Sequence, residues 1–296
     1  MKKISGYLRL MRPANIVTSV ADVLAGIAIS GVLSSALFTE AYILPIVLLC
    51  FSTAFLYAGG VVFNDVFDAE LDKIERPERA IPSGLISVKN AAILGSLQLV
   101  LGIVLAAVVG AIPALLAVLI TVFALVYNKW GKHHDLMGPL NMGICRGLNL
   151  LLGISILTSA LNQWYLLSII PVIYIYSITM ISRGEVHGGS RINLYIASLL
   201  YVSVISAILY WAFMLDRWQW ALVFLIPFSW MIFTPLIKAI KDPVGKNIGK
   251  AVKAGVISLI LMDAAWAATF SSFYLALLIV CLLPLSLYLA KLFAVT

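Results

Sequence analysis

Long apolar stretches separated by short polar loops run through the whole chain. We identify ten of them, each close to the roughly 20 residues with which a helix crosses a bilayer. Their approximate limits are 14–37, 43–67, 91–109, 112–130, 136–159, 164–182, 192–214, 218–238, 251–270 and 272–291. No linker or low-complexity segment divides them. The pattern predicts an all-α polytopic membrane protein with a single membrane domain over residues 1–296.

Basic residues gather in alternate loops. The N-terminus and the second, fourth, sixth and eighth loops carry most of them, whereas the odd-numbered loops carry only Arg217. The positive-inside rule therefore places both termini and the even-numbered loops in the cytoplasm. The net charge of +7 then faces lipid headgroups and does not indicate nucleic-acid binding. With 62% hydrophobic and 11% charged residues, the composition excludes a soluble enzyme.

The second apolar stretch ends in a polar cluster, in the sequence FNDVFDAELD. Asn64, Asp68 and Asp72 recur every four residues and so follow one line along a helix, with Asp65 beside that line. Neighbouring carboxylates repel one another in a low dielectric unless a cation lies among them. Oxygen ligands suit Mg²⁺, which completes its shell with water and phosphate. A solvated helix end is the alternative, but polar residues at membrane depth are costly and usually functional.

The sequence NDVFDAELD resembles the first aspartate-rich motif of the UbiA superfamily of intramembrane prenyltransferases. Arg12, Pro13 and Asn15 open the first stretch as in that family, and Tyr127 with Lys132 resembles its tyrosine–lysine element. The resemblance covers nearly the whole chain. It implies a UbiA-type bundle of nine to ten transmembrane helices around a central cavity open sideways to lipid. It also implies Mg²⁺-dependent transfer of a prenyl (alkyl) group from its diphosphate to a small acceptor.

The same resemblance implies roles for individual side chains. The metal would be held by Asn64, Asp65, Asp68 and Asp72, of which the three aspartates would be catalytic. The diphosphate substrate would be bound by Asn15, Arg76, Arg79, Tyr127 and Lys132. The basic residues also have an ordinary positive-inside explanation, and Tyr127 an alternative one as an interfacial aromatic residue.

The loop after the sixth stretch departs from the family pattern. The family places a second motif, D-x-x-x-D, where this chain reads MISRGEVHGGSRIN, with Glu185 as the only carboxylate. We expect Glu185 to be a further metal-binding and catalytic residue, and Arg183, His187 and Arg191 to bind substrate. A glycine-rich turn without a site is the alternative. SRGEVHGG also resembles EboC-like UbiA homologues, which belong to a bacterial gene cluster linked to the handling or export of a metabolite precursor.

Three ionisable residues lie inside apolar stretches. Arg146, in the fifth stretch near Asn141 and Asn149, needs an anionic partner at this depth. We expect it to face the cavity as a substrate ligand rather than to form a purely structural ion pair. Asp22 and Asp263 leave three roles open: pairing with Arg146, hydrogen bonding between helices, or proton transport.

These inferences converge on an enzyme, an alkyl (prenyl) transferase of the bacterial cytoplasmic membrane. Its cofactor would be Mg²⁺, and its partners a prenyl diphosphate, a small acceptor, the lipid bilayer and other products of its gene cluster. The alternative is a carrier with the same fold that binds a diphosphate lipid or a metabolite precursor for export without transferring a group.

Overall fold

The computed structural model describes residues 2–33, 37, 39–185 and 188–293, and these residues form helices joined by short loops. The helices are α1 (Lys2–Met11), α2 (Pro13–Ser30), α3 (Ile43–Phe67), α4 (Ala69–Glu75), α5 (Val88–Val109), α6 (Ala111–Lys129), α7 (Met137–Ile154), α8 (Thr158–Trp164), α9 (Ile169–Ser182), α10 (Arg191–Met214), α11 (Trp218–Lys241), α12 (Gly245–Phe270), α13 (Phe273–Val280) and α14 (Leu282–Leu292). Short 3₁₀ turns occupy Glu40–Tyr42, Gly131–His133 and Tyr165–Ser168.

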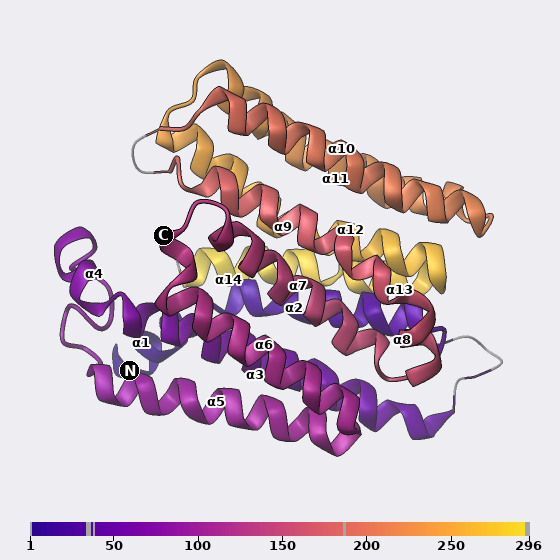
Figure 1. The fold of residues 1–296 in the computed structure, drawn as a ribbon, viewed down its shortest axis with the longest axis horizontal. Helices are drawn as coiled ribbons and strands as arrows, with labels where there is room; N and C mark the ends of the chain where they lie inside the picture. Colours follow the sequence, from indigo (N-terminus) through magenta and orange to yellow (C-terminus); the bar gives the residue numbers. More distant parts are fainter. Residues whose placement is uncertain (1, 34–36, 38, 186–187, 294–296) are drawn as a thin grey trace.

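In the described part of the chain, nine helical segments are long and apolar enough to cross a membrane. Of the ten expected stretches, the fifth, 136–159, forms α7, which is not among the nine because Asn141, Arg146 and Asn149 lower its hydropathy. Both chain ends and α4 lie at one end of the bundle (Figure 1). The predicted all-α membrane architecture is confirmed, and the chain is built as an integral membrane protein.

Two predicted stretches have different limits in the structure. The stretch expected from 164 begins earlier, at Thr158, because α8 and a 3₁₀ turn precede α9. The last stretch, 272–291, is divided into α13 and α14 at Cys281. Pro284 follows that division in the first turn of α14, where its missing N–H costs no helical hydrogen bond.

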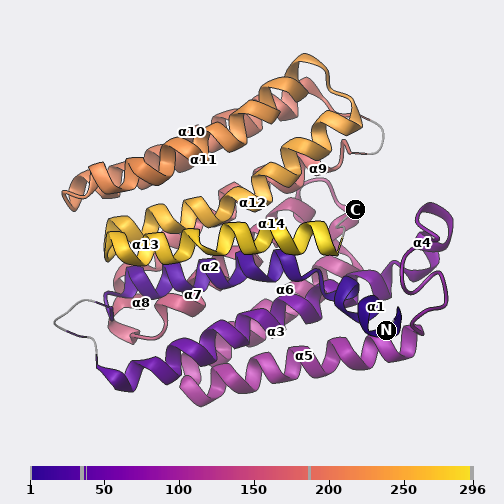
Figure 2. The ribbon, with the colours of Figure 1, turned by 180° about the vertical axis from the view of Figure 1, so that it is seen from behind.

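Two helices, α2 and α12, form the centre of the bundle. In their apolar windows 72% and 78% of the residues are buried, against 28% in each of α5, α6 and α10, whose apolar side chains face outward. Figure 2 shows α14 running along α2, and Ser286 Oγ donates a hydrogen bond to the carbonyl oxygen of Ala14 (3.0 Å). The hairpin of α10 and α11 and the helix α5 lie at opposite edges (Figures 1 and 2).

The contact between α2 and α7 is made by backbone. A Cβ atom on Gly26 would lie 2.3 Å from the carbonyl oxygen of Leu150, and one on Gly153 would lie 2.2 Å from that of Val23. Only glycine fits where two helices approach so closely. This contact fixes the polar face of α7 against α2, which is where Arg146 lies.

Candidate functional site

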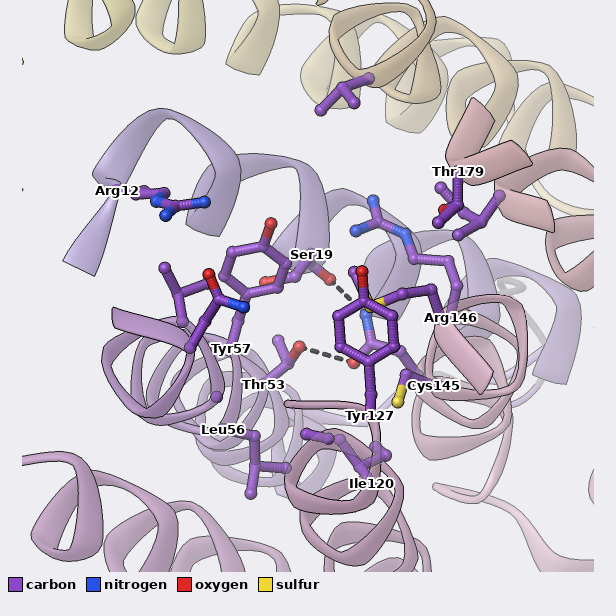
Figure 3. A pocket seen from close by; sticks show the side chains of 18 of the residues that line it. Arg12, Ser19, Thr53, Leu56, Tyr57, Ile120, Tyr127, Cys145, Arg146 and Thr179 are labelled. Carbon is purple, nitrogen blue, oxygen red and sulfur yellow. Dashed lines mark hydrogen bonds between the residues drawn. The ribbon is translucent and has the colours of Figure 1, made fainter. Parts of the chain in front are cut away.

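A cavity of about 260 Å³ lies among α2, α3, α6, α7, α9 and α12 (Figure 3). Asn64 and Arg12 line it at the end nearest α4, and Thr53 and Asn149 line it further into the bundle. Thr53 and Asn64 are eleven residues apart on α3, or roughly 16 Å along the helix axis. Between these polar positions the wall is mostly apolar, and includes Leu56, Ile120, Ile175, Ile178, Val256 and Leu259.

The acidic cluster (Asp65, Asp68 and Asp72) lies where α3 passes into α4. Asp68 is the junction between the two helices, and its N–H still bonds the carbonyl oxygen of Asn64 (3.0 Å). The Asp72 N–H in turn bonds the carbonyl oxygen of Asp68 (2.8 Å). The helical hydrogen-bond pattern therefore continues through the junction. Asn64, one turn before Asp68, lines the cavity, whereas the three carboxylates are not part of its wall.

Each carboxylate of the acidic cluster has a basic partner. Arg79 Nη1 is 2.8 Å from Asp72 Oδ2 and 3.4 Å from Asp65 Oδ1. Lys132 Nζ forms an ion pair with Asp68 Oδ1. The carboxylate side chains are only 4–18% exposed, so these pairs are shielded from bulk water. Arg79 and Lys132, both predicted ligands of the substrate, are thus held beside the carboxylates.

Arg12 was not among the predicted site residues, although it belongs to the R-P-x-N element. Its Nη2 donates a hydrogen bond to Asp65 Oδ1 (2.9 Å), and it lines the cavity. Its backbone is left-handed (φ 48°, ψ 65°) at the break between α1 and α2, and Pro13 begins α2 directly after it. A non-glycine residue in this region is strained by about 1–3 kcal/mol, a cost typical of functional sites.

Asn128 is a second site residue that the sequence reasoning missed. Its Oδ1 accepts a hydrogen bond from Asn64 Nδ2 (3.1 Å), while its own Nδ2 donates to the carbonyl oxygen of Gly60 (2.7 Å). This pair ties α6 to α3 at the cavity and orients the Asn64 amide. The available signal was an asparagine directly after the apolar run of α6, beside the predicted residue Tyr127, which also lines the cavity.

Arg146 lines the cavity, as expected, and it also forms an ion pair with Asp22, one of the three roles that the sequence left open for that aspartate. Its Nε pairs with Asp22 Oδ2, and its Nη2 donates to the carbonyl oxygen of Thr18 (2.8 Å). Asn149 Nδ2 donates to the same Asp22 oxygen (2.9 Å), and Asn149 Oδ1 accepts from Thr53 Oγ1 (2.6 Å). The physical reason is that one guanidinium has enough donors to satisfy a buried partner and still face a cavity.

The loop after α9 is arranged differently from the acidic cluster. Arg183 pairs with Asp135 and donates to the carbonyl oxygens of Lys132 (3.0 Å) and His134 (2.8 Å). Arg191 is exposed at the start of α10, and its Nη2 is 3.4 Å from the carbonyl oxygen of Lys241. Neither lines the cavity, because both guanidinium groups have protein partners outside it.

Among the remaining predicted residues, the structure describes Glu185, Arg76 and Asn15. Neighbouring atoms that displace water raise the pKa of the Glu185 carboxyl, and the guanidinium of Arg76 opposes this rise. Arg76 directly follows α4, and its N–H bonds the carbonyl oxygen of Asp72 (2.9 Å). Asn15 is half-buried in the first turn of α2, and its N–H bonds the carbonyl oxygen of Arg12 (2.9 Å). His187 lies outside the described residues.

The donor set at the acidic cluster fits Mg²⁺ in its chemistry. Each carboxylate uses one oxygen in the pairs above, and no contact among the described residues engages the other. In this arrangement no three His, Cys, Asp or Glu side chains of the described residues are grouped as a complete metal site. The coordination shell of Mg²⁺ would thus combine fewer than three carboxylates with the Asn64 amide oxygen, water and phosphate oxygens. Such a shell is usual for Mg²⁺.

Comparison with known proteins gives a family match over most of the chain. The UbiA prenyltransferase family matches residues 20–252. Digeranylgeranylglyceryl phosphate synthase of Sulfurisphaera tokodaii is 32% identical over 180 residues, which cover 60% of this chain and 61% of that protein. The synthase of the same name from Methanocaldococcus jannaschii is 33% identical over 153 residues, which cover 52% of each chain. The chain thus matches about three fifths or less of the length of these relatives.

Solved structures share the fold. One described as digeranylgeranylglyceryl phosphate synthase has a TM-score of 0.65 at 24% identity, and covers 91% of this chain and 99% of its own. A UbiA homologue from Aeropyrum pernix has a TM-score of 0.66 at 16% identity, and covers 84% and 96%. A UbiA homologue from Archaeoglobus fulgidus, bound to GPP and Mg²⁺, has a TM-score of 0.60 at 16% identity, and covers 90% and 99%.

Proposed function

The chain belongs to the UbiA prenyltransferase family, and we propose that it is an intramembrane enzyme that transfers a prenyl group from a prenyl diphosphate to a small acceptor. The observation that carries this proposal is that Asn64 and Arg12 line one end of an apolar cavity, while Arg12 pairs with Asp65 of the acidic cluster. The acidic cluster and its basic partners therefore adjoin that end of the cavity. That combination provides a charged binding site for a diphosphate and an adjoining apolar space for a hydrocarbon chain.

The basic residues of the site would receive the diphosphate. The carboxylates are neutralised by Arg12, Arg79 and Lys132. When the diphosphate and Mg²⁺ bind together, these basic side chains would instead bind phosphate oxygens. Arginine is suited to this exchange because its planar fork bonds two phosphate oxygens at once. Asn64, Asp65, Asp68 and Asp72 would hold Mg²⁺, directly or through water. When bound, Mg²⁺ acts as a Lewis acid that stabilises the charge of the leaving diphosphate.

The cavity wall would protect the prenyl cation from water during transfer. Breaking the C1–O bond leaves the electron pair on the diphosphate and an allylic cation on the prenyl chain. Apolar side chains such as Leu56, Ile120 and Ile178 exclude the water that would capture this cation. The aromatic rings of Tyr57 and Tyr127 line the same space and can stabilise positive charge through their π faces. The acceptor forms the new bond to C1 and loses a proton.

The names of the curated relatives favour a glyceryl phosphate acceptor with a hydroxyl nucleophile. We also propose the orientation that the loop charges predict, with both termini and the acidic cluster facing the cytoplasm. This orientation delivers a water-soluble diphosphate headgroup directly to the site. A location in the bacterial cytoplasmic membrane, and partners encoded in the same gene cluster, remain predictions from the sequence.

A diphosphate carrier is the second candidate function, favoured by the loop after α9. Its described residues offer Glu185 as the only carboxylate, and Arg183 and Arg191 have partners outside the cavity. A carrier needs the acidic cluster for binding but does not break the C1–O bond. The two functions therefore differ in turnover and not in Mg²⁺-dependent binding.

An assay in lipid nanodiscs separates these candidates. Labelled geranyl, farnesyl and geranylgeranyl diphosphates are offered with Mg²⁺ and glyceryl phosphate acceptors to the wild type, Asp68→Asn and Glu70→Gln. Glu70 is the matched control because it is an exposed carboxylate of α4 that pairs with Lys73. Transfer by the wild type and Glu70→Gln but not Asp68→Asn supports the enzyme. Mg²⁺-dependent binding without transfer supports the carrier, and absence of both refutes the proposal.

A further inference from the structure

Asn128, near the end of α6, is bonded to two positions of α3 that are about one helical turn apart. Its Nδ2 donates a hydrogen bond to the carbonyl oxygen of Gly60 (2.7 Å), and its Oδ1 accepts one from Asn64 Nδ2 (3.1 Å). Asn128 is buried, with only 4% of its surface exposed. The buried amide therefore uses both of its polar atoms on the helix that leads into the acidic cluster.

The carbonyl oxygen of Gly60 determines which way the Asn128 amide faces. A carbonyl oxygen can only accept hydrogen bonds, so the atom of Asn128 beside it must be Nδ2, which donates. The other polar atom of the amide, Oδ1, then faces Asn64. Because Oδ1 can only accept, the atom of Asn64 beside it must in turn be Nδ2. One backbone group thus fixes the orientation of two side-chain amides.

This orientation leaves Asn64 Oδ1 available as a ligand. No hydrogen bond of the described residues engages this oxygen, and Asn64 lines the cavity directly before Asp65 in the chain. Mg²⁺ takes oxygen ligands, whereas an amide NH₂ group presents only hydrogens and repels a cation. A flipped Asn64 would turn its NH₂ group toward the metal and place its oxygen against Asn128 Oδ1.

The end of α6 makes a second contact with the same stretch of chain. Lys132, in the turn that follows α6, pairs with Asp68 of the acidic cluster. Lys132 contributes a charge there, but Asn128 carries none, so Asn128 acts through orientation and packing alone. A single hydrogen bond would suffice to tie α6 to α3, whereas the two made by Asn128 also exclude the flipped amide of Asn64.

We propose that Asn128 is a positioning residue that holds Asn64 with Oδ1 toward the metal, and that it thereby sets the affinity of the site for Mg²⁺. The inference rests on the proposed function only in taking Asn64 as a metal ligand. Groups that orient a metal ligand through a hydrogen bond typically change metal affinity by about 10–100-fold when they are removed.

The tests use the full chain in nanodiscs, with Mg²⁺ titrated in the presence of inorganic diphosphate. Asn128→Leu keeps a branched side chain but removes both hydrogen bonds, so the Asn64 amide is free to turn. Asn128→Ala removes the same bonds and replaces Asn128→Leu if that variant does not fold. Ser52→Ala is the matched control, because the buried Ser52 Oγ of α3 donates to a backbone carbonyl oxygen of α5, that of Gly102 (2.7 Å), more than three turns before Asn64.

The midpoint of the Mg²⁺-dependent rise in Tm measures metal affinity without turnover. Asn128→Leu should need about tenfold more Mg²⁺ than the wild type, whereas Ser52→Ala should have a lower Tm but an unchanged midpoint. An unchanged midpoint in Asn128→Leu would overturn the proposal. A wild type that shows the predicted Mg²⁺ effect but transfers no prenyl group refutes the proposed function alone. Absence of any Mg²⁺ effect in the wild type would overturn both.

An Asn64→Asp background separates orientation from packing. A carboxylate presents an oxygen whichever way it faces, so its binding to a metal does not depend on a flip. In this background Asn128→Leu should therefore change the Mg²⁺ midpoint by less than about twofold, which is within the error of independent effects. An equal loss of Mg²⁺ affinity in both backgrounds would show that Asn128 acts through helix packing, and would overturn the positioning role.

Discussion

Arg79 connects two carboxylates of the acidic cluster, and its removal tests whether a cation is required there. Asp72 has Arg79 as its ion-pair partner among the described residues, whereas Asp65 also pairs with Arg12. The Arg79 side chain is 13% exposed and that of Asp72 is 4% exposed. Arg79→Gln therefore leaves a nearly buried carboxylate without its counter-charge.

The expected loss lies between two measured limits. Breaking a fully buried ion pair costs about 3–5 kcal/mol, and an exposed pair contributes about 0.2–1 kcal/mol. Because the side chains of the Arg79 pairs are only partly exposed, at 4–13%, we expect Arg79→Gln to lower the free energy of unfolding by about 2 kcal/mol. Lys73→Gln is the matched control, since Lys73 pairs with Glu70 at side-chain exposures of 56% and 83%. Its expected cost is about 0.3 kcal/mol.

The change in Tm on adding Mg²⁺ distinguishes a metal-binding role of these carboxylates from a purely structural one. In the wild type, the positive charge of Arg79 would oppose the binding of Mg²⁺ to the free oxygens of Asp65 and Asp72. Removing Arg79 removes that repulsion, so Mg²⁺ should raise the Tm of Arg79→Gln by more than that of the wild type. The assay is thermal unfolding in nanodiscs with Mg²⁺ titrated in the absence of diphosphate. If Mg²⁺ raises the Tm of Arg79→Gln no more than that of the wild type, Asp65 and Asp72 are not metal ligands held in place by Arg79.

Three further substitutions follow from the packing and the contacts. Gly153→Val should prevent the backbone contact between α2 and α7 and lower the free energy of unfolding in nanodiscs by about 3 kcal/mol or more. Gly249→Ala, where an added Cβ atom meets nothing within 4 Å, should leave it unchanged. Thr53→Val removes the hydroxyl that bonds Asn149 and should cost about 1 kcal/mol in the same assay. Arg191→Gln should alter transfer activity by less than about twofold, because this residue is exposed and bonded away from the cavity; a tenfold loss would restore it as a substrate ligand.

Helix positions were predictable because they depend on local pattern. A run of apolar residues long enough to cross the bilayer determines each spanning helix, and even α7 was found despite Arg146. The spacing of Asn64, Asp68 and Asp72 predicted a single helical line, whereas the structure places Asn64 in α3, Asp68 at the junction and Asp72 in α4, with helical hydrogen bonds continuing between them. These are properties of short segments, which the sequence displays directly.

The partners of the charged residues could not be predicted in the same way. Arg12 and Asp65 are 53 residues apart, and Arg183 pairs with a residue 48 positions away. Such pairs depend on which helix faces meet, and this depends on close backbone contacts such as that of Gly26 with Gly153. The positive-inside pattern explained why basic residues occur in these loops but not which carboxylate each one binds.

The central claim is that the acidic cluster binds a prenyl diphosphate for transfer within the membrane. The most direct test is mass spectrometry of products formed by the purified protein in nanodiscs from labelled prenyl diphosphate, Mg²⁺ and a glyceryl phosphate acceptor. The account predicts a prenylated acceptor from the wild type and from Glu70→Gln, with none from Asp68→Asn. Full product formation by Asp68→Asn, or its absence from the wild type with every diphosphate tested, would contradict it.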